Sequence, residues 1–335
     1  MVGQECLAPS FRKYTLGRSA GVEGRYDIST SQSAGLLGST RYEDGSDGYS
    51  SFPVRLFRQL GRYSRYLNYN LSEKELGGYD KELIRRRFEK AGDTYERYAG
   101  MQEYSARRLA DIVAASCPDF EDMKVLEIGA GTGSLTRMLT GGGSMVFPHG
   151  YYANDIVDTM APLYRSMGLT PLMGDISSVD IPYDLDAVVS SNCLQWVSDM
   201  PSLLSGLYSA LKHGGRLCFS TFGFRHFIQL RTLGMAALDY FTLEDMNEML
   251  SDTGFTVEKA EQETDEMLFP SASDMLRYFS LTGVNAVRSP GGMWTPARLA
   301  HFEAGYRREF PASGGELPLT VHYMWFSCSK PRKAR

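Results

Sequence analysis

The residues most able to do chemistry form a glycine-rich turn directly after a short apolar run. Residues 125–128 (Val-Leu-Glu-Ile) have the composition of a buried strand, and residues 129–133 (Gly-Ala-Gly-Thr-Gly) follow it, ahead of a helix-like run. A strand, a glycine turn and a helix in this order form a nucleotide pocket in open α/β sheets. Because glycine has no Cβ, the turn can take positive φ and a ligand can approach its backbone closely.

The spacing of the turn and the acid before it indicate which ligand binds. A dinucleotide fingerprint would place its third glycine where this chain has Ser134, and Glu127 stands two residues before the first glycine. A carboxylate there would repel a pyrophosphate but suits a cation, such as the ammonium and sulfonium of S-adenosylmethionine. We therefore expect this methyl donor, not NAD, to be bound by Glu127, Gly129, Ala130, Gly131 and Gly133.

Polar side chains also follow the next three expected strands. Asp155 is placed to accept hydrogen bonds from ribose hydroxyls, and Asp175 from an adenine amino group, with Ile176 covering the ring. A single aspartate at a strand end often only caps a helix, but acids after successive strands make a more specific signal. The expected ligand contacts beyond the glycine turn are Asp155, Ile156, Asp175, Ile176, Asn192, Gln195 and Trp196.

These residues require an α/β fold with a doubly wound, mostly parallel seven-stranded sheet. Expected strands cover 124–128, 151–154, 170–173, 185–190, 216–221, 255–263 and 319–327, the last two antiparallel at the edge. Expected helices cover 81–91, 102–116, 200–212 and 242–253. An insert at 268–316 precedes the last strand, with helix-like runs at 271–281 and 295–309, and we expect it to form a lid over the carboxyl-end crevice.

Composition limits the remaining possibilities. The chain has 335 residues, 43% hydrophobic content and a net charge of −5, so it can form a full core and has no general attraction to nucleic acid. No apolar run approaches the ~20 residues of a membrane span. The five cysteines are scattered and form no Cys-x-x-Cys pair, which argues against a disulfide framework or zinc site. We expect a cytoplasmic protein that contacts neither membrane nor nucleic acid.

Residues 1–79 differ from the rest and are interpreted as an amino-terminal extension of unknown function, ahead of a catalytic domain at 80–335. Sixteen of the first 50 residues are Gly or Ser. Arg55, Arg58, Arg62 and Arg65 then recur at helical spacing. That segment is either an ordinary amphipathic surface helix or a docking strip for an acidic partner.

The ligand residues resemble those of the class I S-adenosylmethionine-dependent methyltransferases, over about residues 80–328. Further motifs resemble the malonyl-acyl-carrier-protein O-methyltransferases of biotin synthesis. They are Phe88-x-x-Ala91-x-x-x-Tyr95-x-x-x-Ala99-x-x-Gln102, Asn192-Cys-Leu-Gln-Trp196, Ser220-Thr-Phe-Gly223, Thr282-Gly-Val-Asn-Ala286 and Leu317-Pro-Leu-Thr-x-His322. Glu127 replaces the aspartate common in that family but keeps its charge.

The resemblance implies methyl transfer to the free carboxylate of a malonyl thioester on acyl carrier protein. A carboxylate with a pKa near ~4 is already a nucleophile at neutral pH, so no general base is expected. Donors for positioning the malonyl group would be Tyr95, Gln102, Arg288 and His322. Two have competing interpretations: His322 as a core histidine and Arg288 as a solvated charge.

An acidic carrier would dock on a basic patch, and the candidates are Arg85–Arg87, Arg307–Arg308 and Arg225. Two alternatives stay open for the activity itself. One is a class I methyltransferase acting on a small acid or an amine, and the other is a non-catalytic assembly factor that keeps the cofactor site.

Overall fold

The computed structural model describes residues 10–13, 81–142, 147, 149–235, 238, 240–282 and 294–333, and for residues 10–13 and 91–96 it describes only the backbone. These residues belong to one compact unit of the chain. The basic segment around Arg55–Arg65 and the candidate Arg288 lie outside the described residues.

One mixed sheet carries the fold, in the order β1-β7-β8-β6-β5-β2-β3-β4. Its strands are β1 (Ser10–Lys13), β2 (Val125–Ile128), β3 (Tyr151–Asp155), β4 (Thr170–Met173), β5 (Leu185–Ser191), β6 (Leu211–Phe222), β7 (Thr256–Phe269) and β8 (Leu317–Ser329). The five strands β4, β3, β2, β5 and β6 are parallel, and β8, β7 and β1 pair antiparallel. The seven expected strands are thus confirmed, and β1 is an additional edge strand from the amino-terminal extension.

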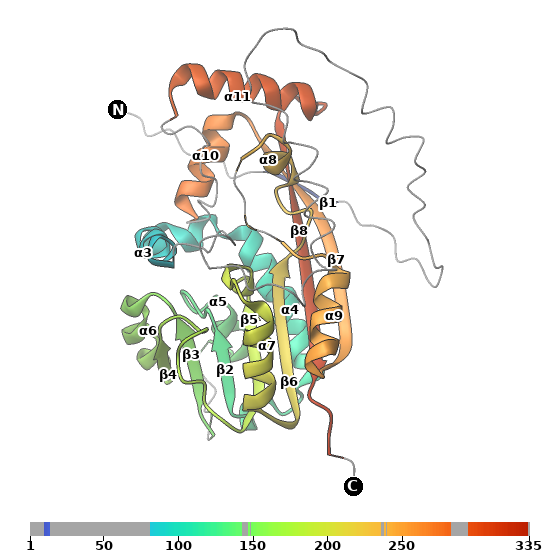
Figure 1. Ribbon diagram of the computed structural model, residues 1–335. Helices are drawn as coiled ribbons and strands as arrows, with labels where there is room; N and C mark the ends of the chain where they lie inside the picture. Colours follow the sequence, from blue (N-terminus) through green and yellow to red (C-terminus); the bar gives the residue numbers. More distant parts are fainter. Residues whose placement is uncertain are drawn as a thin grey trace, which may run out of the picture. The chain divides into compact units, whose positions relative to one another are not determined.

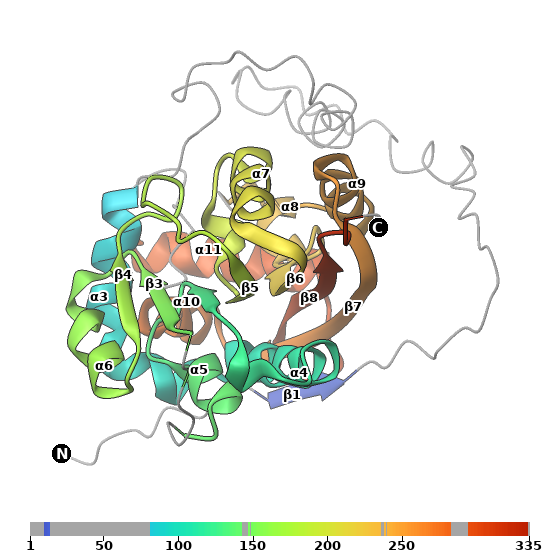
Figure 2. The ribbon, with the colours of Figure 1, turned by 90° about the horizontal axis from the view of Figure 1, so that it is seen from below.

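Helices cover both faces of the sheet (Figure 2), as expected for a doubly wound fold. On one face lie α4 (Gly100–Ser116), α5 (Ser134–Leu139) and α6 (Ala161–Ser166), and on the other lie α7 (Met200–Ala210) and α9 (Leu243–Thr253). Short 3₁₀ turns occur at Phe120–Asp122, Asp158–Met160 and Leu194–Trp196. Because β2 is covered on both faces, all four of its residues are buried.

Local sequence explains where several helices begin and end. The Asp199 side chain accepts from the backbone N–H of Ser202 and caps α7. Thr242 and Asp245 form a reciprocal capping box at the start of α9, and Gly254 ends that helix with a φ of 103°. These signals made both helices predictable to within a few residues.

A second group of helices lies beyond the carboxyl ends of the parallel strands, at the top of Figure 1. The group comprises α3 (Lys81–Tyr98), α8 (Ile228–Thr232), α10 (Ala272–Leu281) and α11 (Pro296–Glu309). Helix α10 packs against both α3 and α11. The two helices of the insert therefore lie beyond the carboxyl ends of the parallel strands, and their role as a lid stays a prediction.

Some boundaries differ from the expectation. Strand β7 runs on to Phe269 and β8 begins at Leu317, because the two strands pair over their whole length, up to the Phe269–Leu317 pair. The insert therefore begins at about residue 270. Helix α3 continues to Tyr98, well past the expected end at residue 91. Among the described residues, no helix has the length and apolar character needed to cross a membrane.

Candidate active site

The glycine turn after β2 adopts the conformation that its sequence predicts. Gly129 has a φ of 67°, and a Cβ at this position would stand 2.4 Å from the Cys193 Sγ, so only glycine fits. Gly131 has a φ of 55°, and a Cβ there would meet nothing closer than 4.0 Å. The backbone at Gly131 therefore faces open space that a ligand can fill.

Asp155, at the end of β3, fixes the turn to the neighbouring strand. Its carboxylate accepts from the backbone N–H of Gly131 at 2.8 Å and of Val157 at 2.9 Å. The hydroxyl of Tyr164 donates to the Gly131 carbonyl at 2.9 Å from the other side. Burial raises the pKa of Asp155, and the two backbone donors partly oppose that effect. Each carboxylate oxygen keeps capacity for a further hydrogen bond from a ligand hydroxyl.

A first pocket extends from this turn toward α3, and we call it the nucleoside pocket. Its polar floor is formed by Asp155 and Asp175, and its apolar walls come from the strand ends and from α3. Phe88 of α3 meets Trp196 edge to face, with 5.6 Å between ring centroids. The expected residues that line it are Gly129, Gly131, Asp155, Ile156, Asp175, Ile176, Asn192 and Trp196.

Asp175 forms an ion pair with Lys81, the first residue of α3. Burial alone would raise the pKa of Asp175, but the Lys81 ammonium and the backbone N–H of Ser177 lower it overall. No sequence pattern predicts this pairing, because 94 residues separate the partners. Lys81 thereby joins α3 to the pocket floor.

A second pocket lies on the α4 side of the same turn, and we call it the acceptor pocket. Gln102, Glu127 and Asn192 line it together with the turn residues Gly129–Thr132. The Oε1 atom of Gln102 and the Oδ1 atom of Asn192 are buried without a hydrogen-bond partner. Unsatisfied buried acceptors are uncommon and costly, so these two atoms indicate a ligand that brings N–H donors.

Glu127 is the buried carboxylate of the acceptor pocket, with 1% exposure, whereas Glu103 and Arg137 line the pocket from exposed positions. The hydroxyls of Thr136, at 2.7 Å, and of Tyr151 both donate to its Oε2. Burial raises the pKa of Glu127 to about 7, although both hydroxyls oppose the shift. A cationic group entering this pocket would favour the ionised carboxylate.

Asn192 is held by a network that reaches across two strands. Its φ of 52° places it in the left-handed region, which asparagine tolerates better than most residues. The Gln195 amide donates to the Asn192 carbonyl at 2.7 Å and accepts from the Thr221 hydroxyl at 3.2 Å. Gln195 is not among the residues that line either pocket, so its contacts fit a supporting role behind Asn192. Gly133 is also absent from both linings and begins α5.

Two of the four residues expected to position a substrate can be located with their side chains. Arg288 lies outside the described residues, and Tyr95 lies in α3, where only the backbone is described. Gln102 faces the acceptor pocket. His322, on β8, is 4% exposed. The structure therefore gives contacts for Gln102 and His322 alone.

Both ring nitrogens of His322 are engaged within the protein. Nδ1 accepts from the backbone N–H of Arg225 at 3.1 Å, and Nε2 lies 2.9 Å from the Gln262 Oε1. Burial lowers the pKa of His322 to about 4, so the ring is neutral at pH 7. The backbone N–H of His322 points to His226 Nδ1 at 3.4 Å. These contacts favour the core-histidine interpretation, since a substrate could reach the ring only by displacing one of them.

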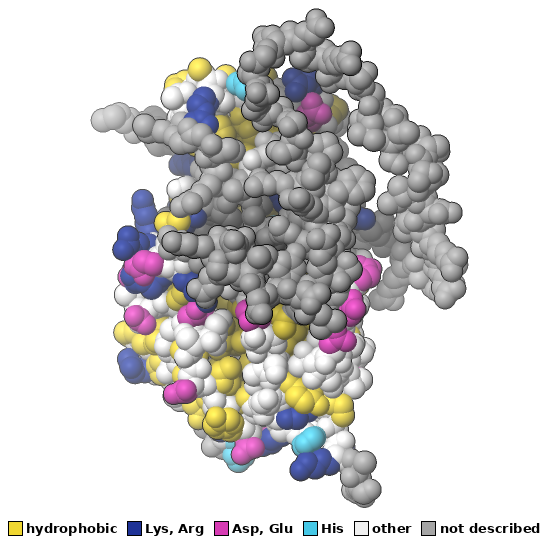
Figure 3. Space-filling view, in the orientation of Figure 1, with side chains coloured by type: hydrophobic (Ala, Val, Ile, Leu, Met, Phe, Trp, Pro, Cys, Tyr) yellow, Lys and Arg dark blue, Asp and Glu magenta, His cyan; other side chains and the backbone are white. Residues whose placement is uncertain are grey.

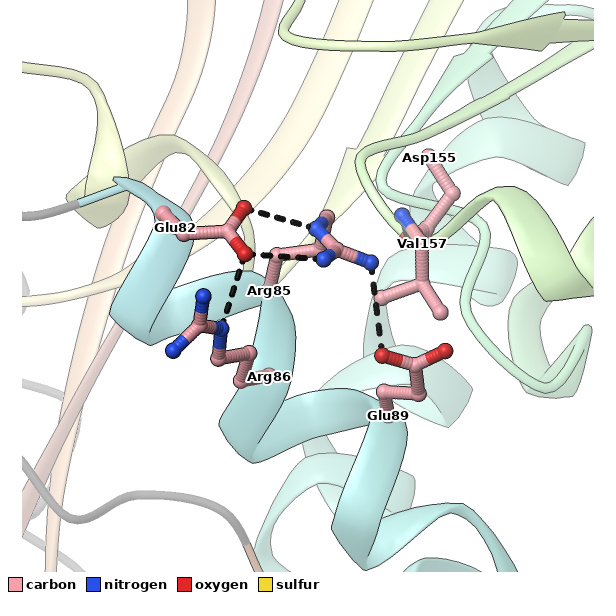
Figure 4. Close-up of polar contacts among 6 residues, drawn as sticks. All are labelled: Glu82, Arg85, Arg86, Glu89, Asp155 and Val157. Carbon is pink, nitrogen blue, oxygen red and sulfur yellow. Dashed lines mark hydrogen bonds and ion pairs between the residues drawn. The ribbon is translucent and has the colours of Figure 1, made fainter.

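The arginine clusters proposed for docking are largely neutralised by their own helices. Figure 4 shows Glu82 pairing with Arg85 and Arg86 along α3, with Arg85 also reaching Glu89. On α11, Arg307 pairs with Glu303 and Arg308 with Glu309. Exposed pairs of this kind contribute little stability, but they reduce the charge offered to a partner.

S-adenosylmethionine fits these two pockets. The nucleoside pocket offers carboxylates for hydroxyl and amino groups between apolar walls. The acceptor pocket offers the buried Glu127 carboxylate and two unsatisfied oxygens, which suit an ammonium, and its lining also includes Glu103 and Arg137. Gly129, Gly131, Thr132, Ser191 and Asn192 line both pockets. The residues missed by the sequence analysis are mainly those of α3 (Lys81, Ile84 and Phe88) and Tyr164, whose placement depends on tertiary packing.

The fold and the two pockets define an S-adenosylmethionine-dependent methyltransferase of class I, and a family model described as "Methyltransferase domain" matches residues 101–260. Curated relatives narrow the assignment. The malonyl-[acyl-carrier protein] O-methyltransferase of Prosthecochloris aestuarii is 37% identical over 73% of this chain and 92% of its own length. That of Acinetobacter baylyi is 33% identical over 72% and 94%, and that of Calditerrivibrio nitroreducens 32% over 73% and 96%. The chain belongs to the malonyl-[acyl-carrier protein] O-methyltransferase family.

Proposed function

We propose that this chain transfers the methyl group of S-adenosylmethionine to the free carboxylate of malonyl-acyl-carrier protein and so forms the methyl ester. The observation that carries the proposal is the pair of unsatisfied acceptor oxygens near Glu127 and the glycine turn, in a chain that spans 92% of a relative named for this reaction. The ester masks a charge, which lets chain-elongating enzymes treat the malonyl group as an ordinary acyl starter for pimelate and biotin synthesis.

Each end of the cofactor has its own proposed contacts. Asp155 would accept from the ribose hydroxyls and Asp175 from the adenine amino group, with Ile156 and Ile176 against the ring. Glu127, Gln102 and Asn192 would surround the ammonium. When bound, the cofactor supplies an electrophilic methyl group on a sulfonium.

The chain itself mainly has to orient and desolvate the reactants. A malonyl carboxylate, with a pKa near ~4, is ionised at neutral pH and needs no base. Orientation alone can contribute about 7–11 kcal/mol in favourable cases. The apolar walls formed by Phe88, Trp196 and Val197 would exclude water from the approach path.

Tyr95, Gln102, Arg288 and His322 stay our proposed positioning residues for the malonyl group, with unequal support. The orphan acceptor of Gln102 suits a cation better than a carboxylate, and His322 is satisfied within the protein. His322→Ala would separate the possibilities. A fall in kcat with unchanged thermal stability would support substrate positioning, whereas a lower melting temperature with normal kcat would support the core role.

A panel of acceptors tests the proposed function. The chain is incubated with S-adenosylmethionine and one of three acceptors: malonyl-acyl-carrier protein, acetyl-acyl-carrier protein or free malonate. The mass of each acceptor is then measured by mass spectrometry. Only the malonyl carrier should gain a methyl group, because the acetyl carrier has no free carboxylate. Equal methylation of free malonate would favour a small-acid methyltransferase instead. The cytoplasmic location expected from the scattered cysteines stays a prediction.

A further inference from the structure

Charge is distributed unevenly between the crevice end of this chain and the remainder. At this end, residues 81–90, 97–98, 223–233, 270–282 and 294–316 together hold twelve Lys and Arg and six Asp and Glu, a net charge of +6 in a chain whose total is −5. Figure 3 shows Lys and Arg side chains gathered around α3 and above it toward α10 and α11. An uneven charge of this kind attracts acidic partners to one end of a molecule.

Two arginines at this end, like Arg97 in the last turn of α3, have no ion pair among the described residues. Arg225 and Arg277 are exposed, and neither has an ion pair or a side-chain hydrogen bond in the part of the chain that the structure describes. They differ in this from Arg85, Arg86, Arg307 and Arg308, which pair with acids on their own helices.

Arg277 occupies the centre of the outer face of α10. The inner face buries Met275, Tyr278 and Phe279, whereas the exposed positions at this spacing are Ser273, Arg277 and Ser280. The acid of α10, Asp274, instead takes part in the cap of that helix, with Ser271. Asp274 lies three residues before Arg277 but makes no ion pair with it.

Arg225 lies just past the end of β6, on a segment that the fold holds rigidly. Its backbone N–H donates to His322 Nδ1, and the N–H of Gly223 donates to the His322 carbonyl at 2.9 Å. The segment leads directly from Thr221, which belongs to the network that holds Asn192. Arg225 is thus four residues from a group that supports the cofactor pockets.

Packing places the two arginines on neighbouring elements. The rings of Phe227 and Phe279 lie 5.2 Å apart, so the segment carrying Arg225 contacts α10, and α10 packs on α3. We propose that the basic rim formed by Arg225 and Arg277 is the surface on which the acidic face of the acyl carrier protein docks. This inference rests on the proposed function and selects one surface from the candidate arginine clusters.

Charge reversal of the full-length chain tests the rim. The variants are Arg225→Glu, Arg277→Glu and their combination. They are assayed with malonyl-acyl-carrier protein, with malonyl-N-acetylcysteamine, a short thioester without a carrier, and with malonyl-4′-phosphopantetheine, which carries the phosphate of the arm alone. The double variant should raise KM for the carrier about tenfold or more and lose most of its salt dependence, with kinetics on the short thioester unchanged. Arg165→Glu is the matched control, because Arg165 is an exposed arginine near the end of α6 and should leave both substrates unaffected.

Three outcomes would contradict the proposal that the carrier docks on this basic rim. A wild-type KM for the carrier in the double variant would place the dock elsewhere. An equal loss on both thioesters would mean that these arginines serve the reaction centre and not the carrier. An equal loss on malonyl-4′-phosphopantetheine would assign the contact to the phosphate of the arm. If the unaltered chain methylates none of these thioesters, the proposed function fails instead, so the two failures are distinguishable.

Discussion

Asn192 donates through its side-chain nitrogen to the backbone carbonyl of Gln102 at 3.2 Å. This bond ties the end of β5 to α4 and brings two unsatisfied acceptor oxygens to the same pocket. A free chain pays for that arrangement in stability, and a cationic ligand would recover the loss.

Gln102→Met should therefore stabilise the free chain and weaken its affinity for S-adenosylmethionine. An unsatisfied buried acceptor costs about 1–3 kcal/mol, so removing it should raise the melting temperature by about 2–4 °C or more. The same change should raise the cofactor Kd about tenfold, as measured by calorimetry.

Ser105→Ala is the control for this prediction. Ser105 lies one turn further along α4, has an unpartnered buried hydroxyl oxygen and lines neither pocket. It should gain stability with no change in cofactor affinity. If Gln102→Met keeps a normal Kd but raises KM for the carrier, Gln102 contacts the substrate and the assignment to the ammonium is wrong.

Asp155→Ala should lose cofactor affinity and stability together. The carboxylate would no longer hold ribose, and the backbone N–H groups of Gly131 and Val157 would lose their acceptor. Each charge-assisted hydrogen bond contributes about 1.5–3 kcal/mol, so the Kd should rise at least tenfold. Calorimetry should also show no NAD binding to the unaltered chain. Asp158→Ala, three residues away and exposed, should behave as wild type, and an unchanged Kd in folded Asp155→Ala would remove Asp155 from the site.

Cofactor affinity should depend on pH through Glu127. Because burial raises the pKa of this group to about 7, a part of the chains carries a neutral Glu127 at neutral pH. A cation binds better to the ionised form, so affinity should rise as pH increases from about 6 to about 8, by up to about tenfold per pH unit below the pKa. Calorimetric titrations of Glu127→Gln should show weaker binding and a flatter pH profile. A wild-type slope in that variant would assign the titration to another group.

Glu127 should also make the stability of the free chain depend on pH, and this stability should fall with rising pH where cofactor affinity rises. Between its ordinary pKa of 4.5 and about 7, folded Glu127 holds a proton that the unfolded chain has released. The contribution of Glu127 to the free energy of unfolding is therefore fully present below pH 4.5 and is lost as pH rises through this window. The total loss is about 3 kcal/mol at most. His322, whose pKa falls to about 4, acts in the opposite direction over the lower part of that window. Thermal unfolding of wild type and Glu127→Gln, compared at each pH, isolates the Glu127 slope.

Deleting residues 1–79 should leave methyl transfer intact. No described residue of either pocket comes from that segment, and its one described element, β1, pairs with residues 265–268 of β7, at the sheet edge. The deletion would expose this edge, so the truncated chain should aggregate more readily and unfold at a slightly lower temperature. A truncated chain that folds but has no activity would show that the extension belongs to the site.

The fold was predictable where local signals are strong. Residues 125–133 show both burial and a turn that needs glycine, and α9 begins at a capping box. Strand β1 was missed because residues 10–13 have no apolar alternation of their own, and only pairing with distant β7 makes them a strand. Pairing with β8 likewise extends β7 beyond its alternating part.

The site was predictable at the strand ends and less so elsewhere. Asp155 and Asp175 follow from topology, since the carboxyl ends of parallel strands meet at one edge. Lys81 reaches Asp175 only because α3 folds back over the sheet, and no sequence pattern reports that contact. The supporting role of Gln195 behind Asn192 was also hidden, because spacing does not show where a side chain points.

The most direct test uses S-adenosylmethionine with an isotopically labelled methyl group and malonyl-acyl-carrier protein, with tandem mass spectrometry to locate the label on the product. The label should lie on the terminal malonyl carboxylate as a methyl ester, one per carrier, and should be released as methanol by mild alkali. Label on a protein side chain, or none on the malonyl group while the chain binds the cofactor normally, would contradict the proposed reaction.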